Sequence, residues 1–243
     1  MFSNFFRNIS PVVKNLLLIN ILFYVAQWTF PEFMSNLELF PVVSEDFRPW
    51  QLATHFFMHS KFSIGHIFFN MFALVIFGAQ LERVWGPQRF LSYYIICALG
   101  ASCLHLLVNY LRINNIEASL TFEEIELFNS TAYDAWQKGM NFKDAKLAQL
   151  SVMYHSPMIG ASGAVFGLLA AFGYLFPNTE LMLLFPPIPI KAKYFVIGYA
   201  VIELYLGISN NPGDNVAHFA HLGGALIGVL ILFYWQKSKN KFF

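Results

Sequence analysis

Six long apolar segments constrain this chain more than any other feature of its sequence. The hydrocarbon core of a bilayer is about 30 Å thick, so a helix needs about 20 predominantly apolar residues to cross it. The sequence therefore predicts an all-α integral membrane protein, a bundle of six transmembrane helices in a single domain over residues 1–243. The predicted spans are residues 15–30, 64–83, 90–111, 159–176, 193–208 and 217–236.

The composition excludes the main alternative, a soluble globular domain. Hydrophobic residues make up 57% of the chain and charged residues only 12%, whereas a soluble domain carries about 25% charged residues. The formal net charge is +1, so the chain lacks the basic character of a nucleic-acid-binding protein. The expected partners are therefore the lipid bilayer and other membrane proteins.

Two connections between the spans are long. Residues 31–63 are aromatic and interrupted by prolines, and we interpret part of this connection as an interfacial segment. Residues 113–156 are polar and rich in acidic residues, with runs typical of helices. We interpret them as an insertion between the third and fourth spans on the extracytoplasmic side, which either covers or gates a site there or is simply solvated.

The distribution of Lys and Arg predicts the orientation, because short cytoplasmic loops are enriched in both. One side carries Arg7, Lys14, Arg83, Arg89, Lys191, Lys193, Lys237, Lys239 and Lys241; the other carries Arg48, Lys61, Arg112, Lys138, Lys143 and Lys146. The first side is predicted to be cytoplasmic, with both termini inside. We expect a multi-pass protein of the inner (plasma) membrane of a bacterial cell, and we interpret the first segment as a retained span.

The fourth predicted span begins with a hydroxyl group among small residues, in the sequence Gly160-Ala161-Ser162-Gly163. The span is slightly short for a bilayer, so we expect its outer end to be recessed. Free N–H groups at a helix N-terminus favour developing negative charge, which suits a nucleophile. Alternatively, the glycines form a packing face of small residues and Ser162 is a passive part of it.

The starts of the sixth and second spans carry further polar residues on the same side of the membrane. His218 and His221 lie three residues apart on one helical face, and His66 and Asn70 lie four apart on another. Such groups are costly inside a membrane and are often functional, although each pair could also bond helices together. Gly224 on the sixth span predicts tight packing against the fourth.

Taken together, these residues supply a nucleophile, a base and oxyanion donors, which is the set that acyl transfer requires. No carboxylate is obviously placed to orient the base, so the sequence favours a Ser–His dyad. Glu203 lies in the fifth span, and we interpret it as structural rather than catalytic.

Four motifs resemble those of the rhomboid family of intramembrane serine proteases. They are "GASGAVFG", "HIFFN", "AHFAHLGG" and "LERVWG", and they occur in the family's order over about residues 45–236. The resemblance implies a six-helix bundle with a membrane-embedded first loop and a wet active-site cavity that opens to the extracytoplasmic side. It also implies single-span membrane proteins as substrates, cut in or near their transmembrane helices.

The resemblance assigns roles to individual residues. Ser162 is the nucleophile and His218 the general base, with His221 as the rival base. His66, Asn70 and the backbone N–H of Ser162 form the oxyanion hole. The residues with a structural role in the motifs are Gly160, Gly163, Glu82 and Gly224.

Other chemistries receive less support. His55 and His59 have the spacing of a zinc pair, but no Glu lies between them, so we expect neither a metal nor another cofactor. A transporter is disfavoured by the absence of internal repeats in the sequence. The main alternative function is a non-catalytic rhomboid-like protein that binds or escorts membrane helices.

Overall fold

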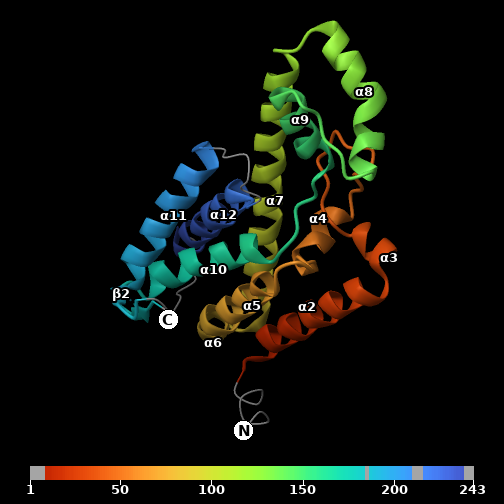
Figure 1. The fold of residues 1–243 in the computed structure, drawn as a ribbon. Helices are drawn as coiled ribbons and strands as arrows, with labels where there is room; N and C mark the ends of the chain where they lie inside the picture. Colours follow the sequence, from red (N-terminus) through yellow and green to blue (C-terminus); the bar gives the residue numbers. More distant parts are fainter. Residues whose placement is uncertain (1–8, 184–185, 210–215, 238–243) are drawn as a thin grey trace.

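The protein is a bundle of helices, described here from a computed structural model that covers residues 9–183, 186–209 and 216–237 (Figure 1). Five helical segments are long and apolar enough to span a membrane within the described residues. They are α2 (Pro11–Thr29), the continuous run of α5 (Ile64–Ala73), η2 (Leu74–Gly78) and α6 (Ala79–Trp85), then α7 (Pro87–Glu117), α11 (Ala192–Ser209) and α12 (His218–Lys237). These segments and the shorter α10 (Ser162–Leu175) coincide with the six predicted spans, and the all-α prediction is confirmed.

Helix α12 lies in the middle of the bundle, where it packs against α7, α10 and α11. Glycines allow the close approach: a Cβ on Gly224 would collide with the carbonyl oxygen of Gly163 on α10. Likewise, a Cβ on Gly167 would lie 2.5 Å from the Sγ of Cys97 on α7. The predicted tight contact between the fourth and sixth spans is therefore confirmed.

Helix α10 begins deep inside the bundle rather than at its surface. Its 14 residues extend about 21 Å at 1.5 Å per residue, less than the thickness of a bilayer core. A Cβ on Gly163 would collide with Ala101, which lies halfway along the 31-residue α7. Ser162, the first residue of α10, therefore sits at mid-height beside α7, as the predicted recess requires.

The carboxylate of Glu82 fastens the start of α2 to the end of α6. It accepts hydrogen bonds from the hydroxyl of Ser10 (2.5 Å) and from the backbone N–H groups of Val12 and Val13 (both 2.9 Å). Negative charge at a helix N-terminus is stabilising because the first N–H groups lack intrahelical acceptors. Glu82 thus joins the first turn of α2 to α6.

The first connection contains three short helices, α3 (Pro31–Ser35), α4 (Gln51–Thr54) and the 3₁₀ helix η1 (His55–Phe57). The buried side chain of Gln51 holds it together, accepting from the backbone N–H groups of Phe40 and Arg48 and donating to the carbonyl of Asp46. Helix α4 packs against α7, and η1 packs against α2 and α10. The connection therefore lies against the bundle; its membrane-embedded position stays a prediction.

The polar segment 113–156 completes α7 and adds two helices, α8 (Phe122–Gln137) and α9 (Ala145–His155). Thr121 and Glu124 form a capping box that starts α8. The inner faces share a small core of their own, made of Ile113, Phe128, Ala132, Leu147 and Leu150. Figure 1 shows this lobe at one end of α7, beyond the end of α11 and the start of α12.

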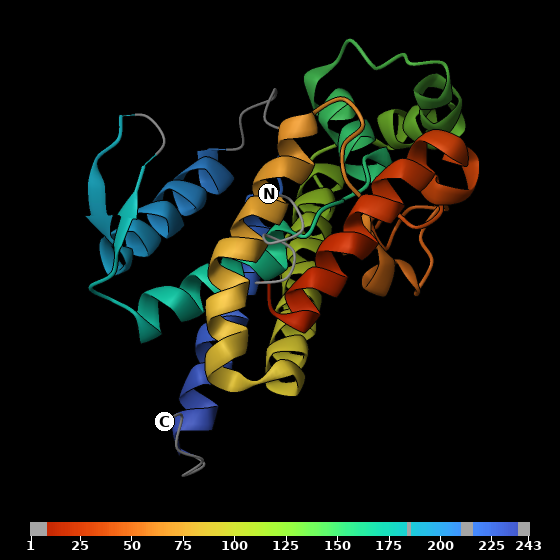
Figure 2. The same ribbon diagram turned by 90° about the horizontal axis from the view of Figure 1, so that it is seen from below.

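One element escaped the sequence analysis, a two-stranded antiparallel sheet between α10 and α11. Strands β1 (Glu180–Met182) and β2 (Pro189–Lys191) pair Glu180 with Lys191 and Met182 with Pro189. This sheet projects from the bundle beside α11 (Figure 2). Arg7, Lys239 and Lys241 lie outside the described residues.

The contact between α10 and α12 predicts a matched pair of glycine substitutions. Gly224→Ala should destabilise the protein by about 1–3 kcal/mol, because overpacking forces the two backbones apart. Gly198→Ala on α11, where a Cβ has nothing within 4 Å, should be neutral or slightly stabilising because alanine favours the helix. Thermal unfolding in detergent measures both, and equal unfolding temperatures for the two variants would contradict the packing.

Candidate functional site

Ser162 and His221 come together from two helices that lie far apart in the sequence. The Oγ of Ser162, at the first position of α10, lies 2.8 Å from the Nε2 of His221 in the first turn of α12. Ser162 is partly exposed, whereas His221 is buried. A hydroxyl within hydrogen-bond distance of an imidazole nitrogen is the geometry of an activated nucleophile.

The expectation that His218 is the imidazole beside Ser162 is wrong. The Nδ1 of His218 instead lies 2.6 Å from the Oε2 of Glu203. His221 is one helical turn further along α12, and the Gly163–Gly224 contact puts it level with Ser162. The sequence did hold a clue, because the motif "AHFAHLGG" contains a second Ala-His pair, Ala220-His221, directly before its two glycines.

Glu203 joins both histidines in one buried cluster. Its Oε2 lies 2.6 Å from the Nδ1 of His218 and 2.8 Å from the Nδ1 of His221, and the residue is 4% exposed. An ionised carboxylate oxygen is acceptor only, so each imidazole donates from Nδ1. The Nε2 of His221 is then the unprotonated nitrogen, and the hydroxyl of Ser162 donates to it.

Phe166 fixes the plane of the His221 ring. It lies on α10 one turn after Ser162, and its ring stacks on the imidazole with centroids 4.2 Å apart and planes 4° apart. Phe166 also packs against Tyr199 of α11. Sequence reasoning gave Phe166 no role, because an aromatic residue in an apolar helix carries no signal of its own.

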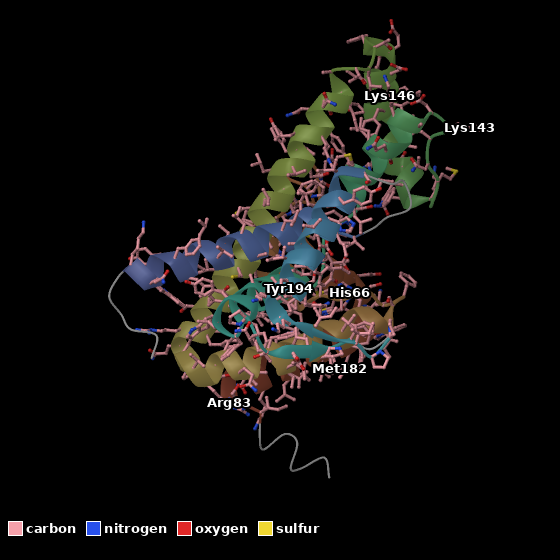
Figure 3. The ribbon with its side chains drawn as sticks, turned by 90° about the vertical axis from the view of Figure 1, so that its left-hand side faces the viewer. His66, Arg83, Lys143, Lys146, Met182 and Tyr194 are labelled. Atoms are coloured by element: carbon pink, nitrogen blue, oxygen red, sulfur yellow. The ribbon has the colours of Figure 1, made fainter. Side chains whose placement is uncertain are left out.

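His66 reaches the same region from α5. Its Nδ1 accepts from the backbone N–H of Ser60 at 3.2 Å, so its Nε2 carries the proton. That nitrogen faces the serine motif: a Cβ on Gly160, whose φ is 117°, would lie 2.7 Å from it. Only glycine suits both this backbone conformation and this contact. In Figure 3, His66 lies between Lys143 and Lys146 at one end of the molecule and Arg83 at the other.

Asn70 is buried one turn after His66. Its Nδ2 donates to the backbone carbonyl of His66 at 2.8 Å. An amide nitrogen has two N–H groups, so the second remains for a ligand.

A small cavity of about 10 Å³ adjoins Ser162 and is lined by residues including His55, Gly160 and Ala220. This volume suits about one water molecule. The ring of His55 bonds the carbonyl of Gln51 and the hydroxyl of Ser102. Burial lowers the pKa of His55 to about 4, so this ring stays neutral at pH 7.

The second histidine of the "HFFMH" segment has different surroundings. Burial lowers the pKa of His59 to about 3, and its ring packs edge-on against His66 with centroids 5.2 Å apart. His55 and His59, which have the spacing of a zinc pair, therefore belong to two separate sets of contacts. In the described part of the chain, the cluster with the composition of a metal site is Glu203, His218 and His221, and its hydrogen bonds already account for the arrangement.

Comparison with known proteins supports the resemblance in sequence. The profile of the Rhomboid domain matches residues 46–120 and 137–238. The unmatched residues between these segments, 121–136, contain most of α8.

Individual relatives match over most of this chain. Rhomboid protein 1, mitochondrial, of Saccharomyces cerevisiae is 26% identical over 99% of the chain and 58% of that protein. RHOMBOID-like protein 12, mitochondrial, of Arabidopsis thaliana is 29% identical over 87% of the chain and 54% of that protein. Rhomboid protease AarA of Providencia stuartii is 29% identical over 89% of the chain and 69% of that protein.

The chain thus spans little more than half the length of the first two relatives. The profile match nevertheless covers well over half of this chain, and it includes the helices that carry Ser162, His66, Asn70, Glu203 and both histidines of α12. This multi-pass membrane protein with a helical bundle fold belongs to the rhomboid family.

Proposed function

We propose that this protein is an intramembrane serine endopeptidase in which Ser162 is the nucleophile and His221 the general base. The observation that carries the proposal is the hydrogen bond of 2.8 Å between the two side chains. It occurs at the N-terminus of a recessed helix. The name of the related protease from Providencia stuartii points to the same class of activity.

The chemistry follows from the positions of the atoms. The Oγ of Ser162 attacks the carbonyl carbon of a substrate peptide, and its proton passes to the Nε2 of His221. The imidazolium then returns the proton to the leaving amine, which leaves an acyl ester on Ser162. A water molecule, activated by the same imidazole, hydrolyses this ester.

The oxyanion of the tetrahedral intermediate needs donors that are in place before the reaction. The backbone N–H groups at the start of α10 lack intrahelical acceptors, and that of Ser162 supplies the first donor. The Nε2–H of His66, directed towards Gly160, supplies a second. The remaining amide proton of Asn70 supplies a third.

The substrates we propose are membrane proteins with a single transmembrane helix. The nucleophile sits at mid-height beside α7, so a substrate carbonyl must enter the bundle to reach it. A helical amide is already hydrogen-bonded, so a substrate segment weakened by helix-breaking residues unwinds more easily and should be preferred.

The first functional prediction concerns the two histidines. A fluorophosphonate probe should label the purified wild type and should not label Ser162→Ala. His221→Ala should lose about 10²–10⁴-fold in labelling rate because it removes the base, whereas His218→Ala should lose much less. The opposite ranking of the two histidine variants would assign the base to His218.

The second prediction concerns the oxyanion hole. Asn70→Ala should lower kcat about 10²–10³-fold, the typical cost of one oxyanion donor, with KM changed little. Cleavage of a single-span model substrate in detergent measures both constants. Ile76→Ala, at an exposed site later in the same helical run, is the control, and an equal loss there would contradict a specific role for Asn70.

The alternative, a non-catalytic family member that escorts membrane helices, makes a different prediction. Such a protein has no need of an aligned serine and histidine. The Ser162–His221 bond therefore favours the protease, and absence of probe labelling in the wild type would favour the escort.

For localisation we propose the inner (plasma) membrane of a bacterial cell, with both termini cytoplasmic and the active site open to the opposite side. The names of two of the relatives place them in mitochondria, so this proposal rests on charge. Arg83 belongs to the predicted cytoplasmic side, and Lys143 and Lys146 lie at the other end of the molecule (Figure 3).

Cysteine labelling tests this orientation. In a variant without Cys97 and Cys103, Lys143→Cys should react with a membrane-impermeant maleimide in intact cells. Arg89→Cys should react only after the cells are permeabilised. The reverse pattern would invert the proposed topology.

A further inference from the structure

The carboxylate of Glu203 is unusual among the acidic residues of the spanning helices. Glu82 and Glu117 lie at or near the end of a helical run, but Glu203 lies six residues before the end of α11 and is buried. A charged carboxylate inside a membrane helix is costly unless it has hydrogen-bond partners. Compensation comes from two imidazole N–H groups, both directed at Oε2.

We propose that Glu203 is the positioning residue of the base, so that Ser162, His221 and Glu203 act as a triad rather than a dyad. This inference rests on the proposed protease function. The carboxylate accepts from the Nδ1 of His221, which forces the lone pair of Nε2 towards Ser162. It also holds negative charge 2.8 Å from the ring nitrogen when the imidazolium forms.

The proton balance requires no proton on Glu203. During attack the proton of Ser162 moves to the Nε2 of His221, and the imidazolium stays hydrogen-bonded to the carboxylate. In a low-dielectric interior this pairing is worth much more than in water. Two contacts therefore fix the orientation of the His221 ring: the hydrogen bond from its Nδ1 to Glu203, and the stacking of Phe166 on its face.

His218 takes a supporting role in this arrangement. Its Nδ1 donates to the same oxygen as His221 does, so it fixes the carboxylate in the position that serves the base. It also borders a cavity of about 100 Å³ lined by polar residues of α7, among them His105, Asn109 and Arg112. This cavity connects the cluster with space for a few water molecules.

A pH-dependent test must consider every ionisable group around the cluster. On α12 these are His218 and His221 themselves, and on α7 they are His105 and Arg112. Tyr199 of α11 interacts with Glu203, and His66 of α5 interacts with His221. Each of these groups remains present in a Glu203 variant, so a changed pH profile reports the carboxylate.

The test is the rate of fluorophosphonate labelling between pH 5.5 and 9, measured on the purified full chain in detergent. Glu203→Gln should label about 10²–10⁴-fold more slowly, in line with the loss of an orienting carboxylate in a serine hydrolase. In the wild type the labelling rate should fall at acidic pH, where His221 becomes protonated, and we call this fall the acidic limb of the pH–rate profile. In Glu203→Gln the acidic limb should lie at lower pH, because the imidazolium has lost its negative partner. Glu203→Asp keeps the charge, so it should recover part of the rate and retain the wild-type limb.

Glu82→Gln is the matched control, since it makes the same change at a buried carboxylate with a structural task. Glu82→Gln should lower the unfolding temperature. Its folded fraction should still be labelled at the wild-type rate and with the wild-type acidic limb. Thermal unfolding of each Glu203 variant gives its folded fraction, and if the Gln variant does not fold, the rate and limb of the Asp variant decide.

Three results would overturn the inference. One is a labelling rate and an acidic limb in Glu203→Gln that equal those of the wild type. Another is an equal loss of labelling rate in the Gln and Asp variants, with the acidic limb of both at the wild-type pH. The third is loss of wild-type labelling on addition of a chelator, which would make the cluster a metal site. A wild type that is never labelled would instead contradict the proposed protease.

Discussion

The arrangement of this molecule depends on one close contact between backbones, that of Gly163 on α10 with Gly224 on α12. No side chain separates the two helices there, so polar groups on both can meet inside an apolar bundle. In a membrane the hydrophobic effect does not drive helices together, and small residues permit the close packing that does. The same contact fixes the register of the helices, and register decides which imidazole faces Ser162.

The buried polar groups form a connected set around this contact. Hydrogen bonds join these groups in a chain: Ser162 of α10 to His221 of α12, His221 to Glu203 of α11, and Glu203 to His218 of α12. Each is costly in an apolar interior unless it has a partner. Their mutual hydrogen bonds give the bundle a polar centre, which the proposed reaction requires and which packing of apolar side chains alone cannot supply.

Elements outside this centre hold it in position. Glu82 fastens α2 to α6, and Gln51 organises the connection that packs beside α10. The positive φ of Gly160 lets the chain turn into α10 with the ring of His66 directly against it. The lobe of α8 and α9 has its own small core, and most of α8 lies in residues 121–136, which the family profile does not match, whereas α9 lies within the matched residues.

The sequence by itself determined where the long apolar helices lie, the shortness of the fourth apolar helix, the glycine contact and the residues from which a site could be built. These follow from hydrophobicity and spacing, which are local properties. Only the tertiary structure decided between His218 and His221, and only it brought Glu203 to both, because the register between packed helices decides which residue of one helical face lies level with Ser162. The small sheet at 180–191 was not predicted, because the pairing of two such short strands leaves no periodic pattern in the sequence.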